Sequence, residues 1–260
     1  MGDTIRVTHV TLRFFLFLMS FAILKSVYGK SLKEKGQRRM KEKGKKLLFI
    51  GLVFIAAFII WTVLIQKVDV QPIGAEHTNV GFASLNGWFH QLTGVNMEIY
   101  VITDWLGLIP ILICMIFGGV GFIQWMKRRS IFRVDYDLVL MGIYYTIVIF
   151  GYLIFEMIPI NYRPILIEGF LEASYPSSTT LLVLSVMPTL TEQVGRRTEN
   201  KMVKIFINSF VIIFTAFMVL GRLLSGVHWI TDIVGAVMLS AGLFCVYKAA
   251  VLLYYKEKGN

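Results

Sequence analysis

Six long apolar runs alternate with shorter polar connections along most of this chain. A helix that crosses a bilayer needs about 20 mostly apolar residues. Five of the runs contain no charged residue, and the sixth contains only Asp232, near its start. The runs are Leu47 to Ile65, Trp105 to Met126, Leu138 to Phe155, Ala173 to Thr191, Ile205 to Gly221 and Trp229 to Tyr247. The pattern predicts an all-α, polytopic membrane protein with a six-helix core.

The residues before the first run form a basic extension, so we predict an N-terminal extension over 1–46 and a membrane domain over 47–260. Within the extension, Phe14 to Leu24 is apolar but short for a span. An interfacial helix is the leading interpretation, and a short seventh span is the alternative. The run lacks a small-residue cleavage site, which argues against a cleaved signal peptide. We expect residues 1–39 to be dispensable for insertion.

Composition supports the membrane interpretation. Hydrophobic residues make up 56% of the chain and charged residues 16%, whereas soluble domains carry about a quarter charged residues. This excludes an ordinary soluble enzyme, a disordered protein and a disulfide scaffold. Cys114 and Cys245 lie inside apolar runs, where a thiol behaves as a small hydrophobe. No Cys/His spacing indicates a metal site, and we expect no cofactor.

The net charge of +10 is distributed unevenly between the connections. Lys30 to Lys46 contains nine Lys or Arg against two Glu, and 127–133 and 196–204 are also basic. By the positive-inside rule these segments face the cytoplasm, which places both ends of the six-helix unit inside. The basic excess therefore reports topology and argues against nucleic acid as a partner. Lys30 to Lys46 is also suited to contact anionic membrane lipids.

Three polar segments remain, and the topology places all of them at the outer face: 160–164, 175–180 and 221–232. In the third, His228 and Asp232 are four residues apart and would share one helix face. A carboxylate beside an imidazole fixes its tautomer and stabilises its charged form. This pair is our candidate for a nucleophile or base.

Arginines and a helix start accompany this pair. Arg163 and Arg222 carry guanidinium groups that suit phosphate, and Ser177 and Ser178 open the fourth run at a helix N-terminus, which favours anions. Taken singly, each has a structural alternative, since an interfacial Arg often anchors a helix and Ser often caps one. An Asp one turn inside a membrane helix is harder to explain structurally, because intramembrane charge is costly. Together they predict a phosphate site.

These segments resemble the type 2 phosphatidic acid phosphatase (PAP2) family, which shares its core with vanadium haloperoxidases. The family pattern is K-x6-R-P, P-S-G-H and S-R-x5-H-x3-D. Arg163-Pro164 matches the end of the first motif, Pro176-Ser177 the start of the second, and Arg222, His228 and Asp232 the third. The resemblance implies that His228 attacks phosphorus and forms a phospho-histidine, and that Asp232 orients it. Arg163, Arg222, Ser177 and backbone N–H groups would hold the phosphate, with no metal required.

Two positions depart from the family pattern. Glu156 stands where the first motif has Lys, and Thr179 stands where the second motif has the His that protonates the leaving group. Losing a general acid typically costs about 10²–10⁴ in rate. The chain could be an impaired relative that only binds lipid phosphate. It could instead use a substrate with a weakly basic leaving group, such as an isoprenyl diphosphate, or a substitute acid among His77, His90, Tyr162 and Glu156.

We therefore predict a lipid phosphatase or diphosphatase acting at the outer face of a cytoplasmic membrane. The alternative is a catalytically impaired lipid-phosphate-binding protein on the same scaffold, and a transporter is a third hypothesis. The first two depend on one expectation, which is that Arg163, Ser177, Arg222 and His228 converge in one outward-facing pocket.

Overall fold

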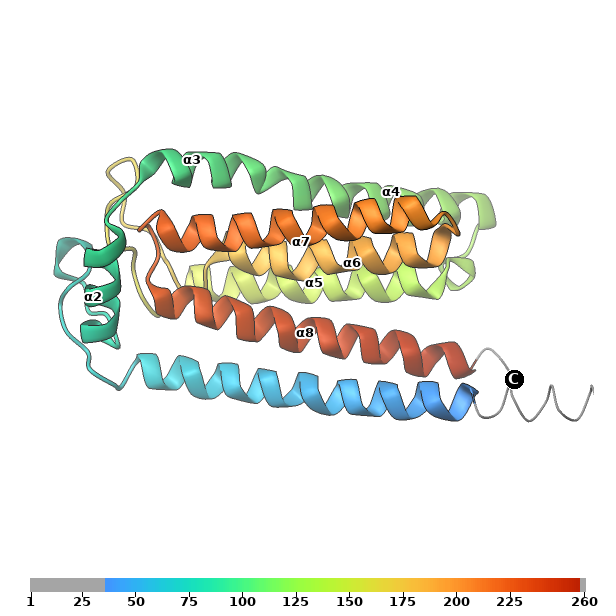
Figure 1. Ribbon diagram of the computed structural model, residues 1–260. Helices are drawn as coiled ribbons and strands as arrows, with labels where there is room; N and C mark the ends of the chain where they lie inside the picture. The colour runs from blue at the N-terminus through green and yellow to red at the C-terminus, as the bar shows by residue number, and fades with distance from the viewer. Residues whose placement is uncertain (1–35, 258–260) are drawn as a thin grey trace, which may run out of the picture.

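The apolar runs fold into helices that lie side by side and alternate in direction (Figure 1). In the computed structural model, which describes residues 36–257, the long helices are Gly36–Ile65 (the first helix), α5 (Tyr136–Met157), α6 (Ser178–Arg197), α7 (Lys201–Leu224) and α8 (Ile230–Glu257). A further long helix, Met97–Arg128, consists of α3 (Met97–Leu106) and α4 (Leu108–Arg128) joined at Gly107. All of these except α6 are long and apolar enough to cross a membrane, which confirms a multi-pass, all-α membrane protein.

Helix α6 is the polar member of the bundle, and its neighbours shield it. It packs against α4, α5, α7 and α8. Thr180, Ser185, Thr189 and Gln193 are buried on it. The Tyr144 hydroxyl donates to the Ser185 carbonyl at 3.0 Å. Because its polar side chains face protein rather than lipid, α6 can occupy the centre of the bundle despite its composition.

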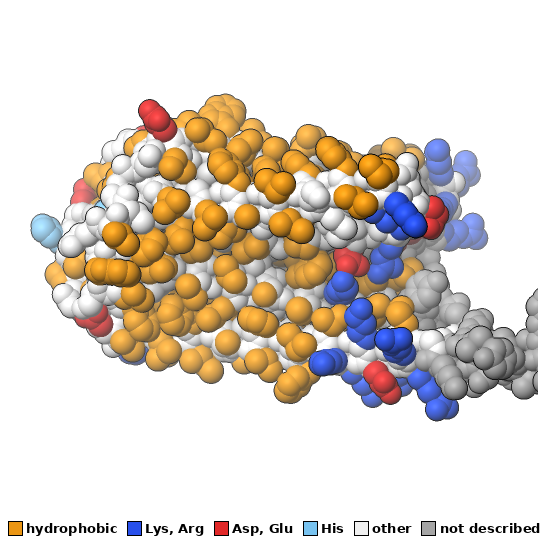
Figure 2. Space-filling view, in the orientation of Figure 1, with side chains coloured by type: hydrophobic (Ala, Val, Ile, Leu, Met, Phe, Trp, Pro, Cys, Tyr) orange, Lys and Arg blue, Asp and Glu red, His pale blue; other side chains and the backbone are white. Residues whose placement is uncertain are grey.

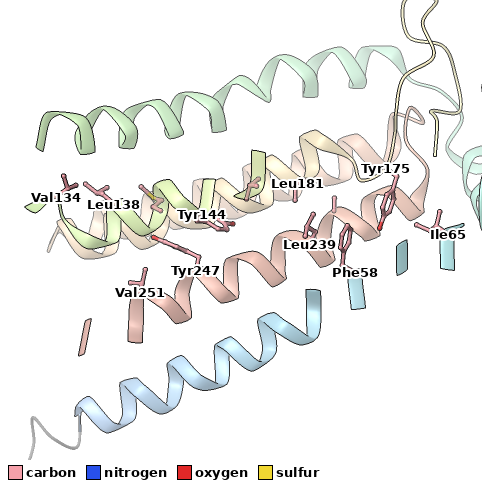
Figure 3. Close-up of a cluster of buried hydrophobic side chains, with 13 residues drawn as sticks. Phe58, Ile65, Val134, Leu138, Tyr144, Tyr175, Leu181, Leu239, Tyr247 and Val251 are labelled. Atoms are coloured by element: carbon pink, nitrogen blue, oxygen red, sulfur yellow. The ribbon is translucent and has the colours of Figure 1, made fainter. Parts of the chain in front are cut away.

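The segment that leads into α6 is fixed by one aromatic residue, Tyr175, at the end of the buried cluster in Figure 3. Its ring stacks on Phe58 of the first helix at 6.0 Å between centroids, and its hydroxyl hydrogen bonds Thr62 Oγ1 at 2.8 Å. The backbone of Gly235 on α8 lies against the same ring, where a Cβ would approach to 2.4 Å. Tyr175 thus ties the entry to α6 to two other helices.

The two ends of the bundle differ in charge. Figure 2 shows Lys and Arg gathered at the end where the first helix begins, with an apolar belt along the middle. The short helix η2 (Ile131–Arg133) lies at this basic end. At the opposite end, η1 (Ala75–His77) and α2 (Ala83–Thr93) cover the bundle, and Asn86 of α2 donates to Thr231 Oγ1 of α8 at 3.0 Å. The separation agrees with the alternation of basic and non-basic connections.

Helix boundaries differ from the predicted ones in three places. The first helix already includes Gly36, the first described residue, and so extends before Leu47, because basic residues can continue a helix beyond the apolar region. The second predicted span starts within a helix that begins at Met97, so Glu98 and Asp104 are helical and do not lie in a loop. Residues 173–177 precede α6, which begins only after Pro176. Phe14 to Leu24 lies outside the described residues.

Candidate active site

The loop that joins α7 to α8 carries His228 and packs closely against the segment between α2 and α3. Gly226 adopts φ 67°, and a Cβ there would lie 1.9 Å from the Gly94 carbonyl oxygen, so the position requires glycine. The Asn96 amide donates to the Ser225 carbonyl at 2.9 Å. This close packing leaves the His228 side chain only 3% exposed.

One nitrogen of His228 is bonded and the other is free. Nδ1 lies 3.2 Å from the Ser174 carbonyl oxygen, so Nδ1 carries the proton and donates. Nε2 is then left with its lone pair, and it is buried with no hydrogen-bond partner in the structure. Burial, followed by the positive charges of Arg163 and Arg222, lowers the pKa of His228 well below 6.5. The imidazole is therefore neutral at pH 7, as a nucleophile must be.

Asp232 lies at 3.8 Å from His228 Nδ1, measured to Oδ2, which is longer than a hydrogen bond. That oxygen accepts from the Trp229 amide at 2.8 Å, and Oδ1 accepts weakly from Asn161 Nδ2 at 3.5 Å. The carboxylate thus caps the first turn of α8 beside the imidazole. In this geometry the Ser174 carbonyl sets the tautomer, and Asp232 contributes a nearby negative charge.

The two arginines lie close to the same aromatic ring, that of Tyr100 on α3. The Arg163 guanidinium is 5.7 Å from the ring centroid and that of Arg222 is 4.9 Å. Nη2 of each is paired, with Glu172 at 3.0 Å and with Asp104 at 2.6 Å respectively. Nε and Nη1 of both are buried without a hydrogen-bond partner in the structure. Because buried donors are normally satisfied, these four nitrogens indicate a site for an anion.

The residues that open α6 have separate environments. Ser177 is fully buried, and its hydroxyl donates to Thr180 Oγ1 at 3.0 Å, so its side chain is already engaged. Ser178 faces a pocket that also contains Arg163 and His228. Thr179 accepts a hydrogen bond from Arg222 Nη2 at 2.5 Å. Of the two serines, Ser178 is therefore the one placed to meet a ligand.

The pocket that contains Arg163 and His228, here called the polar pocket, has a volume of about 220 Å³. Tyr152, Glu156, Glu172 and Ser178 also line it. It lies at the end of the bundle opposite the basic residues, together with α2. Arg163, Ser178 and His228 thus share one cavity. Arg222 does not line it, but its guanidinium lies near the same Tyr100 ring as that of Arg163.

A second cavity, here called the apolar groove, runs between α4, α5 and α6 with a volume of about 550 Å³. Leu108, Ile111, Val148, Ile149 and Leu182 line it, and Thr179 lies at its polar end. Tyr152 and Ser178 line both cavities. A polar cavity therefore adjoins an apolar one, as a molecule with a charged head and a hydrocarbon chain would require.

The alternative acids considered from the sequence have other partners or positions. His90 Nε2 lies 3.1 Å from the Gly226 carbonyl oxygen, and its ring packs on Trp229. Tyr162 does not line the polar pocket. His77 lies in η1 and does not line the polar pocket. Glu156 does line it.

Several residues of the site escaped the sequence analysis: Tyr100, Asp104, Tyr152, Glu172 and the carbonyl of Ser174. Every residue has a backbone carbonyl, so the sequence does not indicate which carbonyl contacts His228. Asp104 directly precedes an apolar run in the sequence, where a charge is equally ordinary for a connection between helices.

Comparison with known proteins agrees with the fold. Residues 138–255 match the family model described as the PAP2 superfamily. The fold is similar to that in the crystal structure of the first transmembrane PAP2 type phosphatidylglycerolphosphate phosphatase from Bacillus subtilis, with a TM-score of 0.54 and 15% sequence identity. The similarity covers 81% of this chain and 97% of that one. No curated protein matches the chain.

Proposed function

Because the chain belongs to the PAP2 superfamily through residues 138–255, we propose that this multi-pass membrane protein is a lipid phosphatase that uses His228 as its nucleophile. The observation that carries the proposal is a set of unpaired, buried nitrogens: His228 Nε2 and the Nε and Nη1 atoms of Arg163 and Arg222. Arg163 lines the same pocket as His228, and both guanidinium groups lie near the Tyr100 ring. A phosphate group would accept from the arginine nitrogens and present phosphorus to Nε2.

The reaction would proceed in two displacements. Nε2 of neutral His228 attacks phosphorus, the bond between phosphorus and the lipid oxygen breaks, and a phospho-histidine remains. Water then attacks phosphorus and releases inorganic phosphate and free His228. The Ser174 carbonyl holds the Nδ1 proton throughout the attack, and Asp232 stabilises the positive charge that develops on the ring.

The leaving oxygen needs a proton that Thr179 is unable to supply, because a hydroxyl of ordinary pKa is a poor acid. Tyr152, like Ser178, lines both cavities, where head and chain would join. A diphosphate leaves as a weakly basic phosphate and needs less help, which keeps isoprenyl diphosphates in any substrate panel.

The apolar groove supports a lipid substrate. Its aliphatic lining would bury part of a hydrocarbon chain at about 25 cal/mol for each Å² removed from water, while the head occupies the polar pocket. Lys and Arg gather at the opposite end of the bundle, so the positive-inside rule orients the polar pocket away from the cytoplasm. For a cytoplasmic membrane this is the outer face.

The test is phosphate release by purified protein from phosphatidic acid, phosphatidylglycerolphosphate and an isoprenyl diphosphate, with His228→Ala as the control. Release that depends on His228, together with a covalent phosphate trapped by acid quench, supports the proposal. Equal release by both proteins contradicts it.

A second function is lipid-phosphate binding without hydrolysis. It is favoured by Thr179, which stands at the position of the family's acid and contacts Arg222 with a neutral hydroxyl. Tight binding of a lipid phosphate by the wild type, with no release over background for any member of the panel, would select it.

A further inference from the structure

Carboxylates surround the phosphate site. Glu156 and Glu172 line the polar pocket together with Arg163 and His228. Asp104 lies beside Arg222. Glu172 and Asp104 each occupy one nitrogen of an arginine, whereas Glu156 forms no ion pair with any residue in 36–257. The exposed side chain of Glu156 thus brings an uncompensated negative charge to a pocket proposed to hold phosphate.

The charge balance disfavours a ligand that is purely anionic. Arg163 and Arg222 contribute two positive charges, and the three carboxylates around them contribute three negative ones. A phosphate held by the free nitrogens of the arginines would lie near Glu156 and Glu172 in a partly dry pocket, where like charges repel more strongly than in water. A ligand that carries a positive charge next to its phosphate would turn this repulsion into attraction.

We propose that the preferred substrate is a lipid phosphate whose headgroup also bears an ammonium group, with the phosphate on the arginines and the ammonium against Glu156 and Glu172. The inference rests on the proposed function for the phosphate half. That the polar pocket binds a ligand is supported by Arg163 and His228. They are 9% and 3% exposed, and both have unpaired nitrogens in this pocket.

The size of the polar pocket favours a ligand larger than phosphate alone. The polar pocket, at about 220 Å³, exceeds what a phosphate alone would fill, given that one water occupies about 30 Å³. Glu156 therefore suits an ammonium that arrives with the substrate.

The experiment compares two soluble headgroup analogues that differ only in the ammonium, O-phosphoethanolamine and ethyl phosphate. Binding to the full-length His228→Ala protein in detergent is measured by calorimetry at pH 7, so that turnover does not interfere. We expect O-phosphoethanolamine to bind about 10-fold more tightly, as for one charge-assisted contact. Glu156→Gln should reduce the ratio to about 1–2, and Glu156→Lys should reverse it.

Controls separate this inference from its premise. Glu168→Gln removes an exposed carboxylate of the connection between α5 and α6 that does not line the polar pocket, and should keep the preference. Equal binding of the two analogues, or a preference that survives Glu156→Gln or disappears with EDTA, overturns the ammonium assignment. If neither analogue binds, or if Arg163→Ala leaves binding unchanged, the proposed phosphate site is refuted instead.

Discussion

Nη2 of Arg222 lies 2.5 Å from Oγ1 of Thr179, at the junction of the arginine pair and the apolar groove. The same nitrogen contacts Asp104 at 2.6 Å. Position 179 therefore lies next to one of the two arginines proposed to hold phosphate, and its hydroxyl is a poor acid for a leaving oxygen. The missing acid and the intact arginine pair can be separated experimentally.

Thr179→His should restore an acid at this position. We expect phosphate release from phosphatidic acid to rise by about 10–100-fold, below the full 10²–10⁴ of a general acid because Arg222 loses a partner. An aryl phosphate, whose leaving group needs no proton, should gain much less. Thr179→Val controls for loss of the Arg222 contact and should show no gain. Equal gains on both substrates would show that position 179 does not act on the leaving group.

The pH dependence of stability should report His228. Its pKa is lowered in the folded state, so below pH 6.5 the unfolded chain binds a proton that the fold excludes. Stability is then lost as pH falls from about 7 towards the folded pKa, by at most about 1.4 kcal/mol per pH unit. Thermal unfolding in detergent at pH 7.5 and 5.5 measures this. The drop in Tm should be smaller in His228→Gln, and an identical drop in both proteins would contradict the neutral, buried imidazole.

Asp104→Asn should strengthen phosphate binding. The carboxylate offsets the charge of Arg222, and its side chain is 59% exposed, so its removal should cost little stability. We expect inorganic phosphate to inhibit about 3–10-fold more strongly because the guanidinium charge is no longer compensated. The inhibition constant and the Tm are the readouts. Glu98→Gln, on the same helix, should change neither. Weaker inhibition by phosphate would indicate that Asp104 is needed to hold Arg222 in place.

Gly226→Ala should destabilise the protein and reduce activity together. The new Cβ would meet the Gly94 carbonyl and the residue would keep a positive φ, so we expect a loss of at least about 1–2 kcal/mol and displacement of His228. Gly118→Ala is the matched control, since nothing lies within 4 Å of its Cβ and α4 should gain helix propensity there. A Tm unchanged by Gly226→Ala would mean that the loop is not fixed at this contact.

Ile111→Trp should impair turnover of long-chain lipids selectively. The indole would fill part of the apolar groove, raising KM for a long-chain phosphatidic acid several-fold while leaving hydrolysis of a water-soluble phosphate unchanged. Ile116→Trp lies on the same helix at comparable exposure and does not line the groove, so it should act like wild type. Equal effects of the two substitutions would place the lipid chain elsewhere.

The sequence predicts the membrane helices well because lipid imposes a simple rule on them. Long uncharged runs indicate helices, and their basic flanks indicate direction. The boundaries at Met97 and Ser178 are less predictable, since polar residues near the membrane surface occur in helices and in loops alike. Charge alone leaves Glu98 and Asp104 undecided, and the structure places both within α3.

In the site, the sequence indicates part of the convergence but not how the residues are paired. Of the four residues expected in one pocket, Arg163 and His228 line it, whereas Ser177 and Arg222 do not. Arg222 instead lies near Arg163 at the ring of Tyr100. The sequence pattern assigns the orientation of His228 to Asp232, whereas the nearest partner of Nδ1 is the Ser174 carbonyl. Ser177 appears equivalent to Ser178 until its hydrogen bond to Thr180 is seen. Such pairings depend on backbone positions that only the fold defines.

Helix α6 has a consequence for how the protein is made. It supplies Ser178 and Thr179 to the site, yet it is not among the helices apolar enough to cross a membrane by composition. On its own it would gain little by leaving the translocon for lipid. Its insertion therefore depends on neighbours such as α5 and α7, which cover its polar side. The helix that carries the chemistry enters the membrane as part of an assembling group, so biogenesis and activity are constrained by the same residues.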